Sequence, residues 1–341
     1  MTSYSVGRKL KLKVRIGFIG TGRIAIRHME KLAKIEDTRL VSVCDVDKEE
    51  AQRVARTFGT NCYTDYRKML DKEKLEAVYI CLPPLAHGDQ EIMAAEKKIN
   101  LFVEKPLALS LKKAYQIDEV IKKNGIISSV GYVYRYSDIV NKVKKKLENR
   151  KIALILGYYF CPLRPVYWWR NKNESGGQIV EQTTHIFDLA RYLVGEINEV
   201  YGQGSRGLME EIENYNLDDT SCVNLRFENG AIGSISSACI LSHGRDWGIN
   251  LIGKGFKIDL LLSSHLLKIT NGKKEKVKMI IDPYQAENNI FIKAIKENNS
   301  EIIKSPYSDA LKTLELTLAA NASLEKGKVI KLNDKKNGWE V

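Results

Sequence analysis

Two groups of residues in this 341-residue chain have types and spacings suited to acid–base chemistry on a hydroxyl group. The first is Glu104-Lys105, which follows the apolar run LFV (101–103) and precedes Pro106. An ammonium group at the end of a buried strand can donate to a hydroxyl oxygen and stabilise negative charge there as a proton and a hydride leave. Glu104 can orient that ammonium group. An exposed lysine in an ordinary strand-to-helix turn would look the same, so position alone leaves both interpretations open.

The second group lies in GGQIVEQTTHIFDLARYL (176–193), where Glu181, His185 and Asp188 share one stripe of a predicted helix with Tyr192. An imidazole titrates near neutrality and can take the proton of an alcohol. Periodicity by itself favours a plainer interpretation, an amphipathic helix with a surface Glu–His pair. The sequence offers no convincing third ligand beside Glu181 and His185, so we predict no metal site. The opposite stripe consists of Ile179, Thr183, Ile186, Ala190 and Leu193.

A glycine-rich turn near the N-terminus is typical of dinucleotide binding. Gly20-x-Gly22-x-x-Ala25 lies between an alternating strand and a helical stretch. Gly20 permits a tight turn, Gly22 lets the backbone approach a pyrophosphate, and Ala25 allows close helix packing. The first residues of the helix, Arg23 and Ile24, bring amide donors and the positive end of the helix dipole.

The next strand-like run, LVSVCD (40–45), ends in Asp45, which predicts the choice of cofactor. Its carboxylate can accept hydrogen bonds from the adenosine ribose hydroxyls and would repel a 2′-phosphate, so we expect NAD rather than NADP. The basic Arg23 nearby would soften that discrimination. Asp47 is the better candidate for the N-cap of the following helix, which leaves Asp45 for the ribose.

The order of predicted strands and helices, which position these residues, changes along the chain. Up to about residue 130, five apolar runs (14–20, 40–45, 77–83, 100–106 and 126–132) alternate with helical stretches. This alternation predicts a parallel sheet, whose ligands bind beyond the carboxyl ends of the strands. Strand-like runs follow a long helix at about 178–194, namely TSCVNLRF (220–227), AIGSISSACI (231–240) and NLIGKGFKIDLLL (250–262).

These rhythms predict an α/β Rossmann domain over residues 1–131 and an α+β domain with a large open, mostly antiparallel sheet over residues 132–341. ENG (228–230) is expected to join two strands as a hairpin, and two helices near 284–297 and 306–326 close the chain.

Composition narrows the class of protein. The net charge of +12 invites a nucleic-acid partner, but the lysines of SDIVNKVKKKLENRK (137–151) surround an apolar helix stripe, so we predict a solvated face and no nucleic acid. The six cysteines form no C-x-x-C pair. With no apolar run long enough for a membrane and no signal peptide in the first residues, we expect a soluble cytoplasmic protein.

The order of motifs resembles the Gfo/Idh/MocA family of glucose-fructose oxidoreductase, inositol dehydrogenase and rhizopine-catabolism proteins. FVEKPLA (102–108) is similar to its E-K-P signature, and GGQIVEQTTHIFDLARYLVG (176–195) to its active-site helix. Further similar segments are IGFIGTGRIA (16–25), CDVDKEEAQRVARTFG (44–59), YTDYRKML (63–70), VGYVYRY (130–136), DDTSCVNLRFENGAIGSI (218–235) and SDALKTLELTLAANASLEKGKVIKL (308–332). Nearly the whole chain is covered.

The resemblance implies an NAD-dependent dehydrogenase of a sugar, cyclitol or related polyol. It places the lysine that contacts the reacting hydroxyl at Lys105, often with a cis peptide before Pro106, and the acid–base histidine at His185. Glu181 stands where the family has aspartate, and we group it with these two as catalytic. The open sheet of such proteins often joins subunits, so a homodimer or homotetramer is expected.

The resemblance also extends the list of expected cofactor and substrate contacts. The family turn T-P-N-x-x-H reads Leu82-Pro83-Pro84-Leu85-Ala86-His87 here, so Leu82 and Pro83 form an apolar wall near the nicotinamide, and His87 either contacts a ligand or begins the next helix. The expected cofactor contacts are Gly20, Gly22, Arg23, Ile24, Asp45, Leu82, Pro83, His87, Glu104 and Lys105. The expected substrate contacts are Tyr132, Arg164, Trp169 and Asp188.

Two points stay open at this level. In the aromatic tract GYYFCPLRPVYWWRNKNESGG (157–177), rings can cover a sugar and arginine can bind a carboxylate or phosphate, or the same rings can pack the core. Alternative functions are an NAD-dependent glycosidase that recycles its cofactor and a dinucleotide-sensing regulator. Retention of both Lys105 and His185 argues against the regulator, since a sensor has no chemical need for them.

Overall fold

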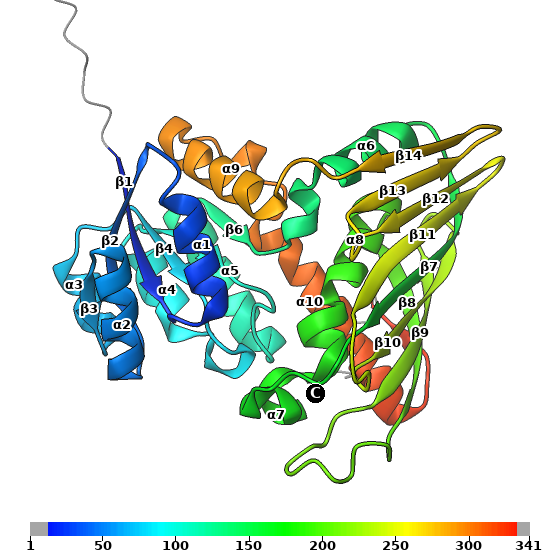
Figure 1. Ribbon diagram of the computed structural model, residues 1–341, viewed down its shortest axis with the longest axis horizontal. Coiled ribbons are helices and arrows are strands. Elements are labelled where there is room, and N and C mark those ends of the chain that lie inside the picture. The colour runs from blue at the N-terminus through cyan, green and yellow to red at the C-terminus, as the bar shows by residue number, and fades with distance from the viewer. Residues whose placement is uncertain (1–12, 333–341) are drawn as a thin grey trace, which may run out of the picture.

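The apolar runs of the first 130 residues form a single parallel sheet. In the computed structural model, which describes residues 13–332, its six strands lie in the order β3-β2-β1-β4-β5-β6 (Figure 1). The expectation of no signal peptide falls on residues outside this range. The strands are β1 (Val14–Ile19), β2 (Thr38–Cys44), β3 (Asn61–Tyr63), β4 (Ala77–Ile80), β5 (Asn100–Val103) and β6 (Ser128–Val130). This order is the doubly wound arrangement that the βαβ rhythm predicts, with its switch point between β1 and β4.

Helices α1 to α5 connect these strands and begin and end where local chemistry dictates. Their bounds are α1 (Arg23–Leu32), α2 (Lys48–Phe58), α3 (Tyr66–Lys72), α4 (Asp89–Glu96) and α5 (Leu111–Asn124), with a short 3₁₀ turn η1 (Pro84–Ala86) before α4. The Asp47 side chain accepts hydrogen bonds from two amides of α2 and caps it, as predicted, and Gly59 ends that helix in the left-handed region.

An aromatic stack ties the first sheet to a helix from the far end of the chain. Phe18, Tyr79 and Phe102 lie on adjacent strands with ring centroids 4.8 and 4.5 Å apart. Phe291 of α9 (Pro283–Glu297) meets Tyr79 and Phe102 edge-on. Helix α9 therefore returns to the parallel sheet and packs beside α1, although it follows the second sheet in the chain (Figure 1).

The second sheet has nine strands in the order β14-β13-β12-β11-β7-β10-β9-β8-β15. All its neighbours pair antiparallel except β7 and β10, which confirms a mostly antiparallel sheet. The strands are β7 (Ile152–Phe160), β8 (Ile197–Ser205), β9 (Thr220–Phe227), β10 (Ile232–Ala238), β11 (Asp246–Gly253), β12 (Phe256–Leu261), β13 (Leu266–Thr270), β14 (Lys274–Lys278) and β15 (Ile330–Lys331). The run 250–262, expected as one strand, is instead the β11–β12 hairpin, because Gly255 turns the chain with φ of 79°.

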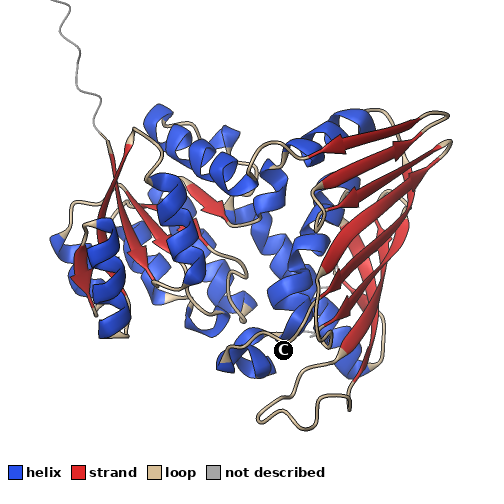
Figure 2. Cartoon of the chain, in the orientation of Figure 1, coloured by secondary structure: helices blue, strands red, loops and turns tan. Residues whose placement is uncertain are grey.

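Helices of the second half cover one face of this sheet (Figure 2). They are α6 (Asp138–Leu147), α8 (Thr184–Val194) and α10 (Tyr307–Lys326). The short helix α7 (Lys172–Ser175) packs instead against η1 and the 3₁₀ turn η3 (Tyr167–Arg170). Two further 3₁₀ turns are η2 (Val133–Tyr136) and η5 (Ser300–Ile302). The helix expected at about 178–194 consists of a π-helical turn η4 (Ile179–Thr183) followed by α8. Within residues 13–332, none of the helices has the length and apolar composition needed to cross a bilayer.

Candidate active site

The glycine-rich turn leaves a space that suits a pyrophosphate. Gly20 has φ of 89°, and a Cβ there would lie 2.2 Å from the carbonyl oxygen of Cys81, so the turn between β1 and α1 requires glycine. A Cβ on Gly22 would meet nothing within 4 Å, which leaves open space at the start of α1. Any larger side chain at position 22 would fill the room that the phosphates need.

The N-terminus of α1 keeps its amide donors available. No side chain caps it, and its first turn, which begins with the exposed Arg23 and half-buried Ile24, holds no acidic residue. Helix α2 differs, since Asp47 caps its first amides and two glutamates lie in its first turn. Because anions bind where helix amides are unpaired, α1 and not α2 suits the phosphates of a dinucleotide.

Asp45, directly after β2, lies against the same turn. Its Oδ2 accepts hydrogen bonds from the backbone N of Thr21 at 2.8 Å and from the Thr21 Oγ1 at 2.9 Å. Its Oδ1 accepts one from the backbone N of Asp47 at 3.0 Å. The carboxylate is only partly buried and so remains accessible to the hydroxyls of a ribose. These residues fit the adenosine end of NAD.

The turn after β4 is stabilised by the buried side chain of His87. The His87 ring lies within 2.6 Å of Glu91 through Nδ1 and within 3.2 Å of the Leu82 carbonyl oxygen through Nε2. Both side chains of the His87–Glu91 pair are fully buried. His87, predicted to contact the cofactor, therefore fixes the shape of the turn that carries Leu82 and Pro83.

Glu104 at the end of β5 is also engaged within the protein. Its Oε1 lies 2.9 Å from Nε2 of the fully buried His28, and its Oε2 accepts a hydrogen bond from the backbone N of Lys105 at 3.1 Å. A Cβ on Gly131 would lie 2.7 Å from both carboxylate oxygens, so only glycine leaves room for this side chain. Glu104 thus fixes the backbone before Lys105 rather than its ammonium group.

The Lys105 ammonium group meets the π-helical turn of the second half. Its Nζ donates to the Glu181 carbonyl oxygen at 2.6 Å and to Glu181 Oε1 at 3.0 Å. Glu181 Oε2 accepts a hydrogen bond from the Trp169 indole at 2.6 Å. Burial alone would raise the pKa of the Glu181 carboxyl, but Lys105 and Trp169 together lower it below its usual value. The Lys105–Pro106 peptide is cis, as the resemblance implied.

His185 lies one turn further along, at the start of α8, between two tyrosine rings. The ring centroids of Tyr132 and Tyr134 are 6.2 and 5.4 Å from that of His185, both edge-on. Burial, and then the positive charge of Lys105, lower the pKa of the imidazole to about 3. Its buried Nδ1 has no hydrogen-bond partner among residues 13–332, which further disfavours a charged ring with two donors. The imidazole is therefore neutral at neutral pH.

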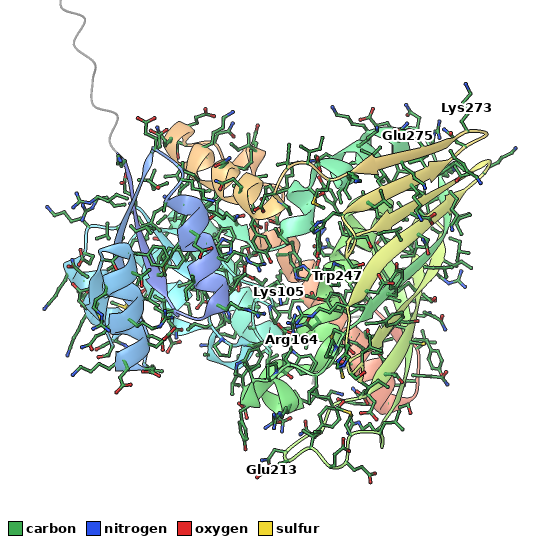
Figure 3. The ribbon with its side chains drawn as sticks, in the orientation of Figure 1. Lys105, Arg164, Glu213, Trp247, Lys273 and Glu275 are labelled. Carbon is green, nitrogen blue, oxygen red and sulfur yellow. The ribbon has the colours of Figure 1, made fainter. Side chains whose placement is uncertain are left out.

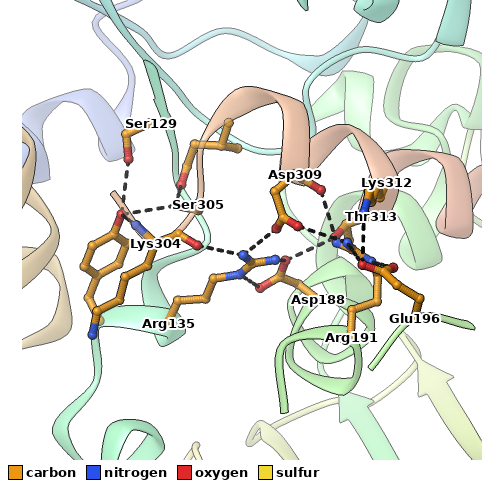
Figure 4. A network of polar contacts seen from close by, with 12 residues as sticks. Ser129, Arg135, Asp188, Arg191, Glu196, Lys304, Ser305, Asp309, Lys312 and Thr313 are labelled. Carbon is orange, nitrogen blue, oxygen red and sulfur yellow. Dashed lines mark hydrogen bonds and ion pairs between the residues drawn. The ribbon is translucent and has the colours of Figure 1, made fainter. Parts of the chain in front are cut away.

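Asp188, predicted as a substrate contact, instead anchors α8 to the segment that links the two sheets (Figure 4). Its carboxylate accepts hydrogen bonds from Arg135 Nε at 2.9 Å, from Arg135 Nη2 at 2.6 Å and from Thr313 Oγ1 at 3.1 Å. Arg135 also forms an ion pair with Asp309 of α10. Because both oxygens of the buried Asp188 are engaged, the residue acts as scaffold.

The other predicted substrate residues have different surroundings. Tyr132 is buried, and its hydroxyl lies 3.0 Å from Thr184 Oγ1, while Trp169 is buried behind Glu181. Arg164 is partly exposed, donates to Gln182 Oε1 at 3.1 Å, and contributes to the low pKa of Glu181. Lys105 and Arg164 lie in the region between the two sheets (Figure 3). Of the four residues, Arg164 alone keeps partial exposure.

Sequence reasoning missed two aromatic neighbours of this group. Tyr134 contacts His185, and its hydroxyl accepts a hydrogen bond from the Trp247 indole at 2.6 Å. The Trp247 ring stacks on Tyr159 at 5.3 Å between centroids. Trp247 carried no local signal, because its place beside the site depends on β11 pairing with β7. Tyr134 lies in VGYVYRY (130–136), one of the segments similar to the family, so that segment could have indicated it.

Comparison with protein families agrees with this geometry. Residues 14–132 match the model described as "Oxidoreductase family, NAD-binding Rossmann fold", and residues 150–258 match the "GFO/IDH/MocA C-terminal domain". Together the two models cover more than half of the chain.

Individual relatives extend over nearly the whole length. The myo-inositol 2-dehydrogenase of Thermotoga maritima is 30% identical, with 94% of this chain and 99% of the relative covered. The scyllo-inositol 2-dehydrogenase (NAD(+)) of Bacillus subtilis is 28% identical, with 95% and 98% covered. A levoglucosan dehydrogenase solved with NADH and levoglucosan has a TM-score of 0.87 over 94% of this chain and 99% of its own, and at 22% identity it supports the fold alone.

Proposed function

We propose, from the premise that this chain belongs to the GFO/IDH/MocA oxidoreductase family, that it oxidises a hydroxyl-bearing carbon of a sugar, cyclitol or sugar derivative. The chain is an NAD-binding dehydrogenase that acts on CH–OH groups. The observation that carries the choice of site is the convergence of Lys105, Glu181 and His185 from two halves of the chain.

Lys105 serves as the donor to the reacting oxygen. An ammonium group has three N–H donors, and the carbonyl oxygen and carboxylate of Glu181 take two of them. The third is available to the substrate hydroxyl, where it stabilises the negative charge that develops as the proton departs. Glu181 holds the ammonium group in position, and Trp169 in turn holds Glu181.

His185 serves as the general base. Its neutral imidazole would take the proton from the substrate hydroxyl. NAD, when bound, would supply the acceptor for the hydride of the carbon that bears this hydroxyl. Tyr132 and Tyr134 fix the orientation of the ring. Because Nδ1 is buried and the residue as a whole is partly exposed, we infer that the Nε2 edge faces the substrate.

The cofactor residues follow from the same fold. We infer that the amides of Arg23 and Ile24 and the open space at Gly22 receive the pyrophosphate, and that Asp45 receives the adenosine ribose. The nicotinamide would lie against Leu82 and Pro83, next to the end of β5. This site would hold NAD beyond the carboxyl ends of the strands, where Lys105 follows β5.

The two inositol dehydrogenases act on inositols, by their names, and this supports a cyclic polyol as substrate here. The partly exposed Arg164 beside Glu181 supports a substrate with an acceptor-rich or anionic substituent.

The test is a substrate screen with a matched control. Purified protein and a His185→Asn variant are mixed with NAD and pools of cyclitols, hexoses, amino sugars and uronates, and both NADH absorbance and product formation are followed. A rise in the wild type alone identifies the active pool and supports the proposal. NADH formation by both proteins at equal rates would contradict the role of His185. Product without NADH accumulation would indicate a glycosidase that recycles its cofactor.

The outer face of the second sheet is proposed as the contact between subunits. On adjacent strands, Leu156 and Ile232 are 42% and 51% exposed, and Tyr158 stacks on Phe160 beside them. Exposed apolar side chains gathered on one face are typical of an interface. Light scattering should show an oligomer that Leu156→Lys with Ile232→Lys dissociates, whereas Leu208→Lys on a surface loop should not. An unchanged mass in the double variant would exclude this face.

A further inference from the structure

We propose that Thr21 is a specificity-determining residue, which sets the preference for NAD over NADP by holding the carboxylate of Asp45 in place. The inference rests on the placement of the adenosine ribose at Asp45 proposed above. Thr21 is the residue between the two glycines of the phosphate-binding turn, and its own side chain has no phosphate role in that placement.

Three donors converge on the Asp45 carboxylate. Thr21 contributes two of them to Oδ2, its backbone N at 2.8 Å and its Oγ1 at 2.9 Å, and the backbone N of Asp47 bonds Oδ1 at 3.0 Å. Hydrogen bonds to an ionised acceptor are the stronger kind. The carboxylate is therefore fixed at both oxygens and cannot rotate without leaving donors of Thr21 unpaired.

Thr21 is itself held rigidly. Its side chain is fully buried, so an Oγ1 that lost Asp45 would have no water to replace it. The residue before it, Gly20, has its N bonded to the Cys44 carbonyl oxygen at 2.8 Å and its backbone pressed against Cys81. The turn thus presents the two donors of Thr21 from a fixed place at the end of β2.

A fixed carboxylate at Asp45 discriminates between NAD and NADP more sharply than a mobile one would. It can accept hydrogen bonds from the ribose hydroxyls of NAD without rearrangement, which lowers the cost of binding. A 2′-phosphate at the same place meets a negative charge that cannot turn away. If the carboxylate were free to rotate, the exposed Arg23 at the start of α1 would be available to bind the phosphate, and NADP would be tolerated.

The experiment measures binding of the reduced cofactors without any substrate. Nucleotide fluorescence gives the Kd of NADH and NADPH for the wild type, Thr21→Val, Thr21→Ser and Asp45→Ser. The valine variant keeps the shape and the backbone N–H but loses the hydroxyl, and the serine variant keeps the hydroxyl. We expect the ratio of the NADPH Kd to the NADH Kd to fall about tenfold in Thr21→Val, equivalent to about 1.4 kcal/mol, and to remain near the wild-type value in Thr21→Ser.

The Asp45→Ser variant tests the placement of the ribose at Asp45 separately from the role of Thr21. If Asp45→Ser abolishes the preference but Thr21→Val keeps the wild-type ratio, the role of Thr21 is overturned and the ribose placement stands. If Asp45→Ser also leaves the ratio unchanged, the ribose placement itself fails. Thermal unfolding of each variant is followed in parallel, and Thr21→Ala, which also lacks the hydroxyl, replaces the valine variant if the latter does not fold.

Discussion

The Lys105 ammonium group bonds Glu181 twice, at 2.6 Å to the backbone carbonyl oxygen and at 3.0 Å to Oε1. These contacts join the end of β5 to a π-helical turn that lies 76 residues further along the chain. The carbonyl that accepts from Lys105 belongs to the π-helical turn η4, whose hydrogen bonding differs from that of a regular α-helix. The position of the Lys105 ammonium group therefore depends on how the two halves of the chain are joined.

Loss of the Lys105 ammonium group should reduce turnover far more than cofactor binding. In Lys105→Met the reacting oxygen loses its charged donor, so kcat/KM should fall by about 10²- to 10³-fold. The Kd for NADH should change little. Lys105→Arg keeps the charge but not the compact geometry and should not restore activity. Steady-state kinetics and fluorescence titration check both quantities, and a fully active Lys105→Arg would show that charge alone suffices.

Trp169 should affect catalysis although it lies behind the carboxylate. In Trp169→Phe, Glu181 loses the 2.6 Å hydrogen bond from the indole, and the pKa of its carboxyl should rise. A hydrogen bond to a charged group is worth about 1.5–3 kcal/mol, so kcat should fall by about tenfold or more. Trp168→Phe is the matched control, because that indole does not bond Glu181. Equal kcat values in the two variants would argue against this role.

The first half of the chain was largely predictable because its signals are local. The glycine spacing, the position of Asp45 after a strand and the cap at Asp47 all act within one βαβ unit.

In the second half, one local signal was present but was given too little weight. The run 250–262 was predicted as a single strand from its apolar composition, although Gly255, which has a positive φ, turns it into a hairpin.

Two features of the second half could not be predicted from local sequence patterns, namely the partner of Asp188 and the π-helical turn. Helical periodicity predicted that Asp188 lies on the stripe of His185, but it does not tell which element packs against that stripe. The partner is Arg135, from the segment between the two sheets. The π-helical turn at 179–183 was hidden for a related reason, since residues on either side of it follow the same apolar rhythm.

The ion pair between Arg135 and Asp188 should contribute strongly to stability. Both side chains are almost completely buried, so Asp188→Asn leaves a guanidinium whose remaining ion pair, among residues 13–332, is the one with Asp309. Breaking a buried pair costs roughly 3–5 kcal/mol, and because Asp309 remains we expect about 3 kcal/mol from urea unfolding. Asp309→Asn, whose side chain is 32% exposed, should cost less. The reverse order would contradict this assignment.

The two glycines of the phosphate-binding turn should fail in different ways. Gly20→Ala places a Cβ 2.2 Å from the Cys81 carbonyl oxygen at φ of 89°, so the melting temperature should fall. Gly22→Val meets open space at an ordinary φ of −65° and should fold normally. Its side chain would fill the expected phosphate site, so the Kd for NADH should rise by at least about tenfold. Unchanged NADH binding in Gly22→Val would place the phosphates elsewhere.

His185 should make the protein less stable in mild acid. Its pKa is about 3 in the folded chain, below the ordinary value of 6.5, so the unfolded chain binds a proton between these pH values and the folded chain does not. The stabilisation by the neutral ring is complete above about pH 6.5 and is lost as the pH falls toward 3. Between pH 7.5 and 4.5 this amounts to roughly 2–3 kcal/mol. In urea unfolding at both pH values, His185→Gln should lose less stability than the wild type by that difference. Equal losses would mean that the imidazole titrates normally in the folded protein.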